Sequence, residues 1–167
     1  MPKLREIDQK PLEFMQAIKD FVDNPRGFFI MSGTNGNGKT FAARAIFEHF
    51  YHPHGDNQFW NQIDLKMKFQ DVFAEYKSTS YLLDQVVKAP LLVLDDLGIS
   101  KPTDTFADFL YAIADKRDHS KNTCGTIITT NLSANDFAIT FGNAFLSRVA
   151  SGIILRYDGP DRRRTKF

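Results

Sequence analysis

The chain has 167 residues, of which 43% are hydrophobic and 13% aromatic, and this is enough for one globular domain with a closed core. Its 21 lysines and arginines nearly balance 20 aspartates and glutamates, so the formal net charge of +1 gives no broad attraction to nucleic acid or membrane. The single cysteine excludes an internal disulfide, and no apolar stretch reaches the about 18 residues of a membrane-spanning helix. The amino-terminal sequence MPKLREIDQK has no apolar signal core, and we therefore expect a cytoplasmic protein without a membrane partner.

Short apolar segments alternate along the chain with longer segments of helical periodicity. A first helix is expected at residues 11–22, where four apolar residues share one face: Leu12, Met15, Ile18 and Val22. Strands are expected at 28–31, 58–60, 91–94, 126–129 and 153–157. Further helices are expected at 39–51, 64–76, 80–88, 104–118 and 133–150, the last of them broken near Gly142. Because a parallel crossover needs about a dozen residues and usually takes a helix, this alternation predicts a parallel sheet covered on both faces, a three-layer α/β domain.

A glycine-rich loop connects the first predicted strand to the second predicted helix. It matches the phosphate-loop pattern G-x-x-x-x-G-K-[ST] at every position: Gly33, Thr34, Asn35, Gly36, Asn37, Gly38, Lys39 and Thr40. Glycines let the backbone adopt positive φ and approach a phosphate closely, and N–H groups at the helix start then surround the anion. Lys39 is expected to reach the β and γ phosphates of ATP, and the Thr40 hydroxyl to coordinate Mg²⁺. A glycine-rich turn without a ligand is the alternative, and the strand and helix on either side favour the phosphate loop.

Two aspartates follow the apolar strand at 91–94, in the sequence LLVLDDLG. Four consecutive apolar residues predict a strand buried on both faces, and the carboxyl ends of such strands are where open α/β sheets bind ligands. Asp95 is therefore the expected acid on the Mg²⁺ side of a Walker B element. Asp96 is expected to orient and polarise an attacking water, a place more often held by glutamate, and a capping or solvated position in the turn is the alternative.

Two further polar residues are candidates for the same site. Asn131 ends the apolar strand in TIITTN, where its amide could hold the attacking water or the γ-phosphate, or could simply start the turn before Leu132. Arg148 lies in FLSRV on an otherwise apolar short helix, and a lone helical arginine is usually a solvated charge with a packed stem. The residues alone leave both assignments open.

Together, these segments resemble the AAA+ ATPases of the DnaC/DnaI helicase-loader and IstB transposition-helper group. The matching pieces are the glycine loop, DDLG, TIITTN, FLSRV and the closing YDGPDRRR, which run in order from about Asn24 to Arg164. The resemblance implies a P-loop NTPase with an AAA+ core, whose central parallel strands lie in the order 5-1-4-3-2. It also implies that Asn131 is the sensor-1 residue, that Asp96 takes the place of the catalytic acid, and that Arg148 is an arginine finger. Such a finger reaches the ATP of a neighbouring subunit in a head-to-tail oligomer.

The sequence departs from this group at both ends. We expect residues 1–23 to form an amino-terminal helix and linker, and residues 24–167 the ATPase core, with no carboxyl-terminal helical lid. Loaders of the group carry an additional amino-terminal region that binds the replicative helicase. The sequence therefore leaves open whether this chain binds a DnaB-type helicase. Arg117 receives no role, and the basic run of Arg162, Arg163 and Arg164 fits a solvated tail as well as a phosphate or DNA contact.

Single-stranded DNA is the partner that the resemblance implies, because the group uses helices after the second strand to line a DNA-facing surface. The corresponding residues 63–85 contain charge and aromatic faces, the two ingredients of sequence-neutral strand binding: Lys66, Lys68, Phe69, Tyr76 and Lys77. The apolar and aromatic residues of this segment also recur at helical spacing, which a buried core face explains more simply. The lysines are therefore the favoured DNA contacts.

These observations predict an ATP-dependent helicase-loader-type ATPase that binds and hydrolyses ATP and contacts single-stranded DNA during replication initiation. One alternative is an IstB-like transposase helper, which would favour duplex DNA. Another is a nucleotide-gated DNA-binding module with negligible turnover, which an aspartate at position 96 would allow. A nucleotide or small-molecule kinase shares the glycine loop, but it needs an acceptor pocket and gives the segments TTN and LSR no evident purpose.

Overall fold

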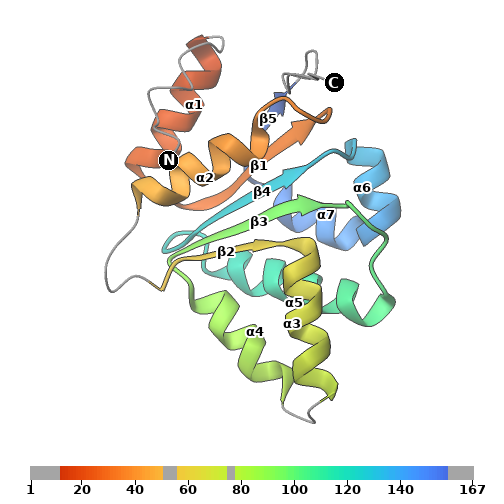
Figure 1. Ribbon diagram of the computed structural model, residues 1–167. Coiled ribbons are helices and arrows are strands. Elements are labelled where there is room, and N and C mark those ends of the chain that lie inside the picture. Colours follow the sequence, from red (N-terminus) through yellow and green to blue (C-terminus); the bar gives the residue numbers. More distant parts are fainter. Residues whose placement is uncertain (1–11, 51–55, 75–77, 158–167) are drawn as a thin grey trace, which may run out of the picture.

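The computed structural model describes residues 12–50, 56–74 and 78–157, which form a parallel sheet with helices on both faces (Figure 1). Strands and helices alternate along the chain as the sequence predicts. In chain order they are α1 (Leu12–Asp23), β1 (Gly27–Gly33), α2 (Lys39–His49), β2 (Gln58–Asn61), α3 (Gln62–Ala74), α4 (Thr79–Lys88), β3 (Leu91–Leu97), α5 (Asp104–His119), β4 (Gly125–Thr130), α6 (Ala134–Phe141), α7 (Asn143–Val149) and β5 (Ile153–Tyr157). Within the described ranges, no helix is long and apolar enough to cross a bilayer.

The strand pairs of the sheet are all parallel, and the order across it is β2-β3-β4-β1-β5. This is the predicted order 5-1-4-3-2 read from the opposite edge, so the expected arrangement is confirmed. Because the strands run the same way, their carboxyl ends meet along one edge of the sheet, where open α/β folds bind ligands.

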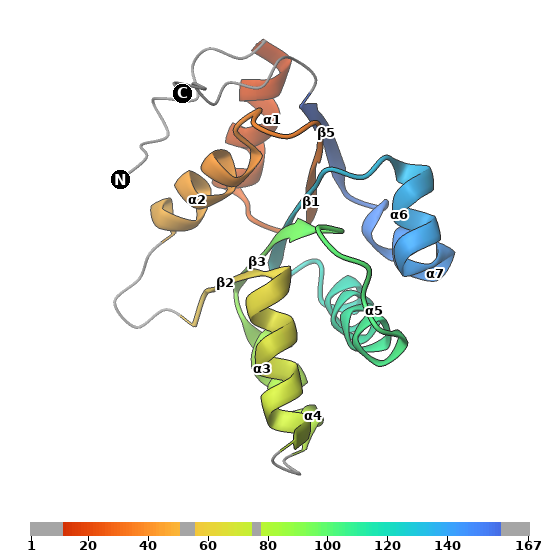
Figure 2. The same cartoon turned by 45° about the vertical axis from the view of Figure 1, so that its right-hand side comes forward.

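Each face of the sheet has its own hydrophobic cluster. Figure 2 shows α1 and α2 on one side of the sheet and α5, α6 and α7 on the other. Along β3, Leu91 and Val93 belong to the cluster with α1 and α2, whereas Leu92 and Leu94 belong to the cluster on the opposite face. This period-two alternation explains why a strand buried on both faces has an apolar residue at every position.

The helix α1 packs on the sheet through a face that periodicity alone did not select. From residue 14 onward, its buried residues are Phe14, Ile18 and Phe21. Met15 and Val22, which share the predicted face with Ile18, are only partly buried. The large aromatic side chains bury more apolar area, and the ring of Phe21 lies 4.7 Å from that of Phe29 on β1.

The helix boundaries lie within two residues of the predicted ones. Helix α3 begins at Gln62, earlier than predicted, because Asn61 Oδ1 accepts a hydrogen bond from the backbone N–H of Asp64 at 2.8 Å and so caps the helix. The predicted helix over 133–150 is divided into α6 and α7 at Gly142, which has a φ of 92°.

Arg117 is a buried structural residue. Its guanidinium donates hydrogen bonds of 2.5–2.8 Å to the Thr126 hydroxyl and to the carbonyls of Val87, Ala89 and Gly125. Burial lowers the pKa of this group below the ordinary value of arginine, and the acceptors offset part of the cost of removing the charge from water. These contacts tie the end of α4 to the amino ends of β3 and β4, the sheet edge opposite the expected ligand site.

Candidate functional site

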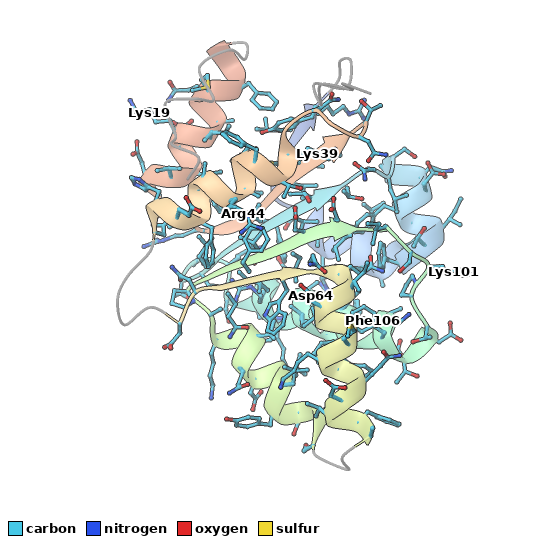
Figure 3. The ribbon with its side chains drawn as sticks, in the orientation of Figure 1. Lys19, Lys39, Arg44, Asp64, Lys101 and Phe106 are labelled. Atoms are coloured by element: carbon cyan, nitrogen blue, oxygen red, sulfur yellow. The ribbon has the colours of Figure 1, made fainter. Side chains whose placement is uncertain are left out.

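The glycine loop joins β1 to α2 at the carboxyl edge of the sheet, and Figure 3 shows Lys39 at the start of α2. Gly33, Gly36 and Gly38 have φ angles of 136°, 75° and 87°, which residues with a side chain rarely adopt. A Cβ on Gly33 would also overlap the backbone carbonyl of Tyr157 at the end of β5. Gly38 occupies the N-cap and so places no side chain between the first turn of α2 and an approaching anion.

Lys39 is buried inside the loop. Its ammonium donates to the carbonyl oxygens of Gly33 at 2.8 Å and Thr34 at 2.7 Å. Asn37 is buried as well, and its Nδ2 donates to the Thr34 hydroxyl at 2.6 Å and to the Tyr157 carbonyl at 2.7 Å. Asn37 therefore anchors the loop to β5, while Lys39 places a positive charge within the loop.

The first acid, Asp95, lies where the loop meets β3 and β4. Its Oδ1 accepts hydrogen bonds from the Thr40 hydroxyl at 3.1 Å and from the Thr129 hydroxyl at 2.6 Å. The residue is 3% exposed, and a buried carboxylate is costly unless such donors replace water. Sequence reasoning did not select Thr129, although a threonine in a strand of buried residues beside the acid-bearing strand is a usable signal.

The second acid, Asp96, lies in a β-bulge. The pairing of β3 with β4 shifts between Leu94 and Leu97. Among the residues that the structure describes, Asp96 is the one non-glycine residue with positive φ, at 55°. Its backbone N–H donates to Thr129 Oγ1 at 2.8 Å. One hydroxyl thus holds both acids, through the carboxylate of Asp95 and the backbone of Asp96.

The oxygens of Thr40 and Asp95 fit a divalent cation. Adjacent ligands of an octahedral Mg²⁺ lie about 3 Å apart when each Mg–O distance is about 2.0–2.1 Å, and these two oxygens are 3.1 Å apart. In the described part of the chain, no group of three or more His, Cys, Asp or Glu side chains is arranged to hold a metal. An ion here would therefore take its remaining ligands from phosphate and water, as Mg²⁺ usually does in nucleotide sites.

A cleft of about 690 Å³ brings the predicted segments together. It is lined by the glycine loop, the segment after β3 and the end of β4: Asn35, Gly36, Asn37, Gly38, Lys39, Thr40, Asp96, Gly98, Ile99 and Asn131. A smaller hollow of about 250 Å³, lined by both acids and the start of α3, lies on the α3 side. The larger cleft has the size of a small-molecule site, for which about 300–1,000 Å³ is typical.

The chain does not bring Arg148 to its own cleft. Arg148 lies in the last turn of α7 and donates from Nε to Asp115 Oδ1 at 2.9 Å. A hydrogen bond with Tyr111 and the charge of Asp115 raise the pKa of Arg148 above its ordinary value. Helix α7 leads into β5 at the amino end of the strands, where Gly152 lies against Phe28 of β1, whereas the glycine loop follows the other end of β1. Arg148 therefore lies away from the glycine loop of its own chain.

The lysines predicted to contact DNA lie on α3 as far as the structure describes them. Lys68 is exposed and Lys66 partly exposed. Phe69 is buried in the core, whereas Phe73 is 64% exposed, so Phe73 is the aromatic residue on α3 that a partner can reach. The predicted contacts Lys77 and Tyr76, and the basic run at 162–164, lie outside the described residues.

The parallel sheet, the glycine loop and the paired acids define a P-loop nucleotide-binding protein with the AAA+ fold. The chain belongs to the family of IstB-like ATP binding proteins, which it matches over residues 3–155. A search of curated proteins gave no match. The family membership confirms the resemblance that the loop and the acid motif indicated.

Solved structures of replication proteins share this fold. The crystal structure of the DnaC helicase loader is 28% identical, with a TM-score of 0.78, over 93% of this chain and 96% of that chain. The crystal structure of DnaI is 22% identical, with a TM-score of 0.70, over 96% and 90% of the two chains. The replication initiator DnaA bound to AMPPCP and single-stranded DNA has a TM-score of 0.80 at 13% identity, over 93% of this chain and 49% of that one.

Replacement of Thr129 by valine keeps the shape of the side chain and removes the hydroxyl shared by Asp95 and Asp96. We expect the free energy of unfolding to fall by about 2 kcal/mol, because a hydrogen bond to a charged group contributes about 1.5–3 kcal/mol. Urea unfolding measures the change. Thr129→Ser keeps the hydroxyl and loses one methyl group, so its stability should lie within about 1 kcal/mol of wild type. Equal stability of Thr129→Val and wild type would contradict the network.

Proposed function

We propose that this chain is a cytoplasmic ATPase of the helicase-loader type, which hydrolyses ATP with Mg²⁺ and contacts single-stranded DNA during replication initiation. The observation that carries the proposal is the cleft in which the glycine loop, Asp96 and Asn131 converge. Membership of an ATP-binding family supports it, as does 28% identity to the DnaC helicase loader over nearly the whole of both chains. In this proposal, residues 24–167 form the ATPase core, and α1 packs on it.

The positive side of the cleft would bind the phosphates. Lys39 supplies a charge within the loop, and the amino end of α2 adds its N–H groups and helix dipole. Thr40 and Asp95 would hold Mg²⁺, which when bound neutralises charge on the β and γ phosphates. Reception of a phosphate requires the Lys39 ammonium to turn from the loop carbonyls to the anion, a small movement because the carbonyls belong to the same loop.

The acidic side of the cleft would perform the chemistry. Asp96 lines the cleft and is held by Thr129 at its backbone, so its carboxylate can orient a water and accept its proton as the water attacks the γ-phosphate. Asn131 is exposed at the same cleft, where its amide can bind the water or a γ-phosphate oxygen. The two residues would act on the terminal phosphate only. Their substitution should therefore change the hydrolysis rate more than the affinity for ATP.

We expect Asp96→Asn to keep ATP affinity within a few-fold and to slow hydrolysis by about 10²–10⁴-fold, the usual contribution of a general base. The amide preserves the shape of the side chain while it loses the charge that polarises water. Phosphate release measures turnover, and calorimetric titration measures affinity. Asp108→Asn, an exposed aspartate on α5, is the control and should behave as wild type. Equal turnover of Asp96→Asn and wild type would contradict a catalytic role for the Asp96 carboxylate.

Contact with single-stranded DNA is proposed for the outer surface of α3. Lys68 is exposed and Phe73 is 64% exposed on this helix, which supplies the charge and the aromatic face that sequence-neutral binding uses. A net charge of +1 provides no general attraction to DNA, so the contact depends on such local residues.

Arg148 is proposed to complete the cleft of a neighbouring subunit. It is 39% exposed, and its partner Asp115 is 31% exposed, so the ion pair lies at the surface and can be exchanged for another anion. An arginine finger contributes about 10³–10⁵-fold to the rate in other NTPases. A head-to-tail assembly would bring Arg148 of one subunit to the γ-phosphate in the next.

Mixing two inactive variants tests this assembly. Arg148→Ala should bind ATP with almost no turnover, and Lys39→Ala should fail to hold ATP while it still offers Arg148. In a mixture, some interfaces pair an intact loop with an intact Arg148, so we expect phosphate release to reappear and to peak near equal proportions. The control mixture is Lys39→Ala with Asp96→Asn, which should not exceed the residual turnover of Asp96→Asn because both residues act within one cleft. If sedimentation shows assembly and the first mixture stays inactive, Arg148 does not act in trans.

A second candidate function is that of a transposase helper on duplex DNA, which the match to IstB-like proteins favours. It uses the same ATP cleft and differs in its partner. A pull-down with the replicative helicase and with a transposase, in ATP or in ADP, separates the two functions. A nucleotide-gated module is the outcome if the wild-type chain binds ATP and releases no phosphate.

A further inference from the structure

Gln62, the first residue of α3, is buried, although a polar residue at the start of a helix is usually exposed. Its Oε1 accepts a hydrogen bond from the N–H of Gly98 at 2.6 Å. Its Nε2 donates to the carbonyl of Ser100 at 2.7 Å and to the Ser100 hydroxyl at 3.2 Å. These partners belong to the segment of residues 96–100, where the chain leaves β3. Gln62 therefore fastens α3 to this segment.

The segment that Gln62 holds has an uncommon backbone. Asp96 has a φ of 55°, Gly98 has a φ of 94°, and the N–H of Ile99 closes a turn to the Asp96 carbonyl at 3.1 Å. A left-handed non-glycine residue costs about 1–2 kcal/mol, and such strain persists only where surrounding contacts hold it. Thr129 holds the segment from β4, and Gln62 holds it from α3.

The same segment forms a wall of the nucleotide cleft. Asp96, Gly98 and Ile99 line the cleft together with the glycine loop. Ile99 also lines the smaller hollow with Ile63, the residue after Gln62. A nucleotide that enters the cleft therefore contacts the backbone segment to which the Gln62 amide is hydrogen-bonded.

Helix α3 carries exposed apolar side chains at and beyond this junction. Ile63, Met67 and Phe73 are 48%, 58% and 64% exposed. The strand before α3, β2, is a short strand at the edge of the sheet, so a shift of α3 disturbs one side of the sheet only. The helix thus begins at the acid segment and exposes apolar side chains along its length that a partner can contact.

We propose that Gln62 is a positioning residue that couples the nucleotide cleft to α3. Binding of nucleotide against residues 96–100 reduces the motion of α3 through the Gln62 amide. A partner bound on α3 in turn affects the position of Asp96 through the same contacts. Such reciprocity is required of any coupling between two binding equilibria. The inference rests on the proposed function only in that nucleotide occupies the cleft, and it does not need hydrolysis.

Trp60 offers a readout of this coupling, because it is the only tryptophan of the chain and lies two residues before Gln62. The test uses the whole chain with and without the non-hydrolysable analogue AMPPCP and Mg²⁺. We expect the wild-type Trp60 fluorescence to change and to saturate at the affinity that calorimetry gives. We also expect hydrogen exchange of the α3 amides to slow by about fivefold or more, the low end of typical coupling between two sites.

Gln62→Met keeps the length of the side chain and removes its hydrogen-bonding amide. This variant should bind AMPPCP within a few-fold of wild type and lose both responses, whereas a merely structural role would leave them unchanged. Gln70→Met, an exposed glutamine in the same helix, is the matched control and should keep both responses.

The outcomes separate the two proposals. A wild-type chain that fails to bind AMPPCP contradicts the proposed function and, with it, the coupling. A wild-type chain that binds AMPPCP without a response in α3, or a Gln62→Met variant that keeps the full response, overturns the coupling alone. If Gln62→Met does not fold, Gln62→Glu replaces it, because glutamate keeps the acceptor for Gly98 and loses the donor to Ser100. A full response in that variant overturns the coupling as well.

Discussion

A carboxylate buried at the end of β3 is the constraint on which the site depends. Asp95 is 3% exposed, so protein donors must replace the water that its charge has lost, and the hydroxyls of Thr40 and Thr129 do so. Thr40 follows β1 and Thr129 lies in β4, which separates β1 from β3 in the sheet. The same hydrogen bonds therefore fix the relative positions of three carboxyl ends. The loop and the acids meet because β3, β4 and β1 are parallel and lie next to one another in this order.

The charges of the cleft complement a nucleotide that carries a metal ion. Lys39 and the start of α2 offer positive charge to phosphate, while Asp95 and Asp96 offer negative charge to a cation, and the two halves touch at the contact between Thr40 and Asp95. Arg148 lies at the other end of the strands, and Asp115 holds its side chain in the isolated chain. The cleft and Arg148 thus lie at opposite ends of the strands within one chain.

The sequence predicted those parts of the site that are formed by residues close together in the chain. The glycine loop is a contiguous motif, and the alternation of apolar and helical segments placed the helix ends within two residues of their observed positions. The strand order came from the resemblance to a known group, and it is confirmed. Long-range contacts were not predictable, because Thr129 and Asp95 are 34 residues apart, Gln62 and Gly98 are 36 apart, and periodicity does not say which side chains meet. In α1, apolar residues lie on more than one face, so spacing alone could not select the aromatic one.

Calorimetric titration of ATP with Mg²⁺ into the wild-type chain and into Lys39→Ala tests most directly whether the cleft is a phosphate site. We expect one ATP per wild-type chain and an affinity lower by about a hundredfold or more in Lys39→Ala. Each hydrogen bond to a charged group contributes about 1.5–3 kcal/mol, and about 1.4 kcal/mol corresponds to a tenfold change in affinity. Circular dichroism should show the same fold in both proteins. An unchanged affinity in a folded Lys39→Ala variant would contradict the assignment of the cleft.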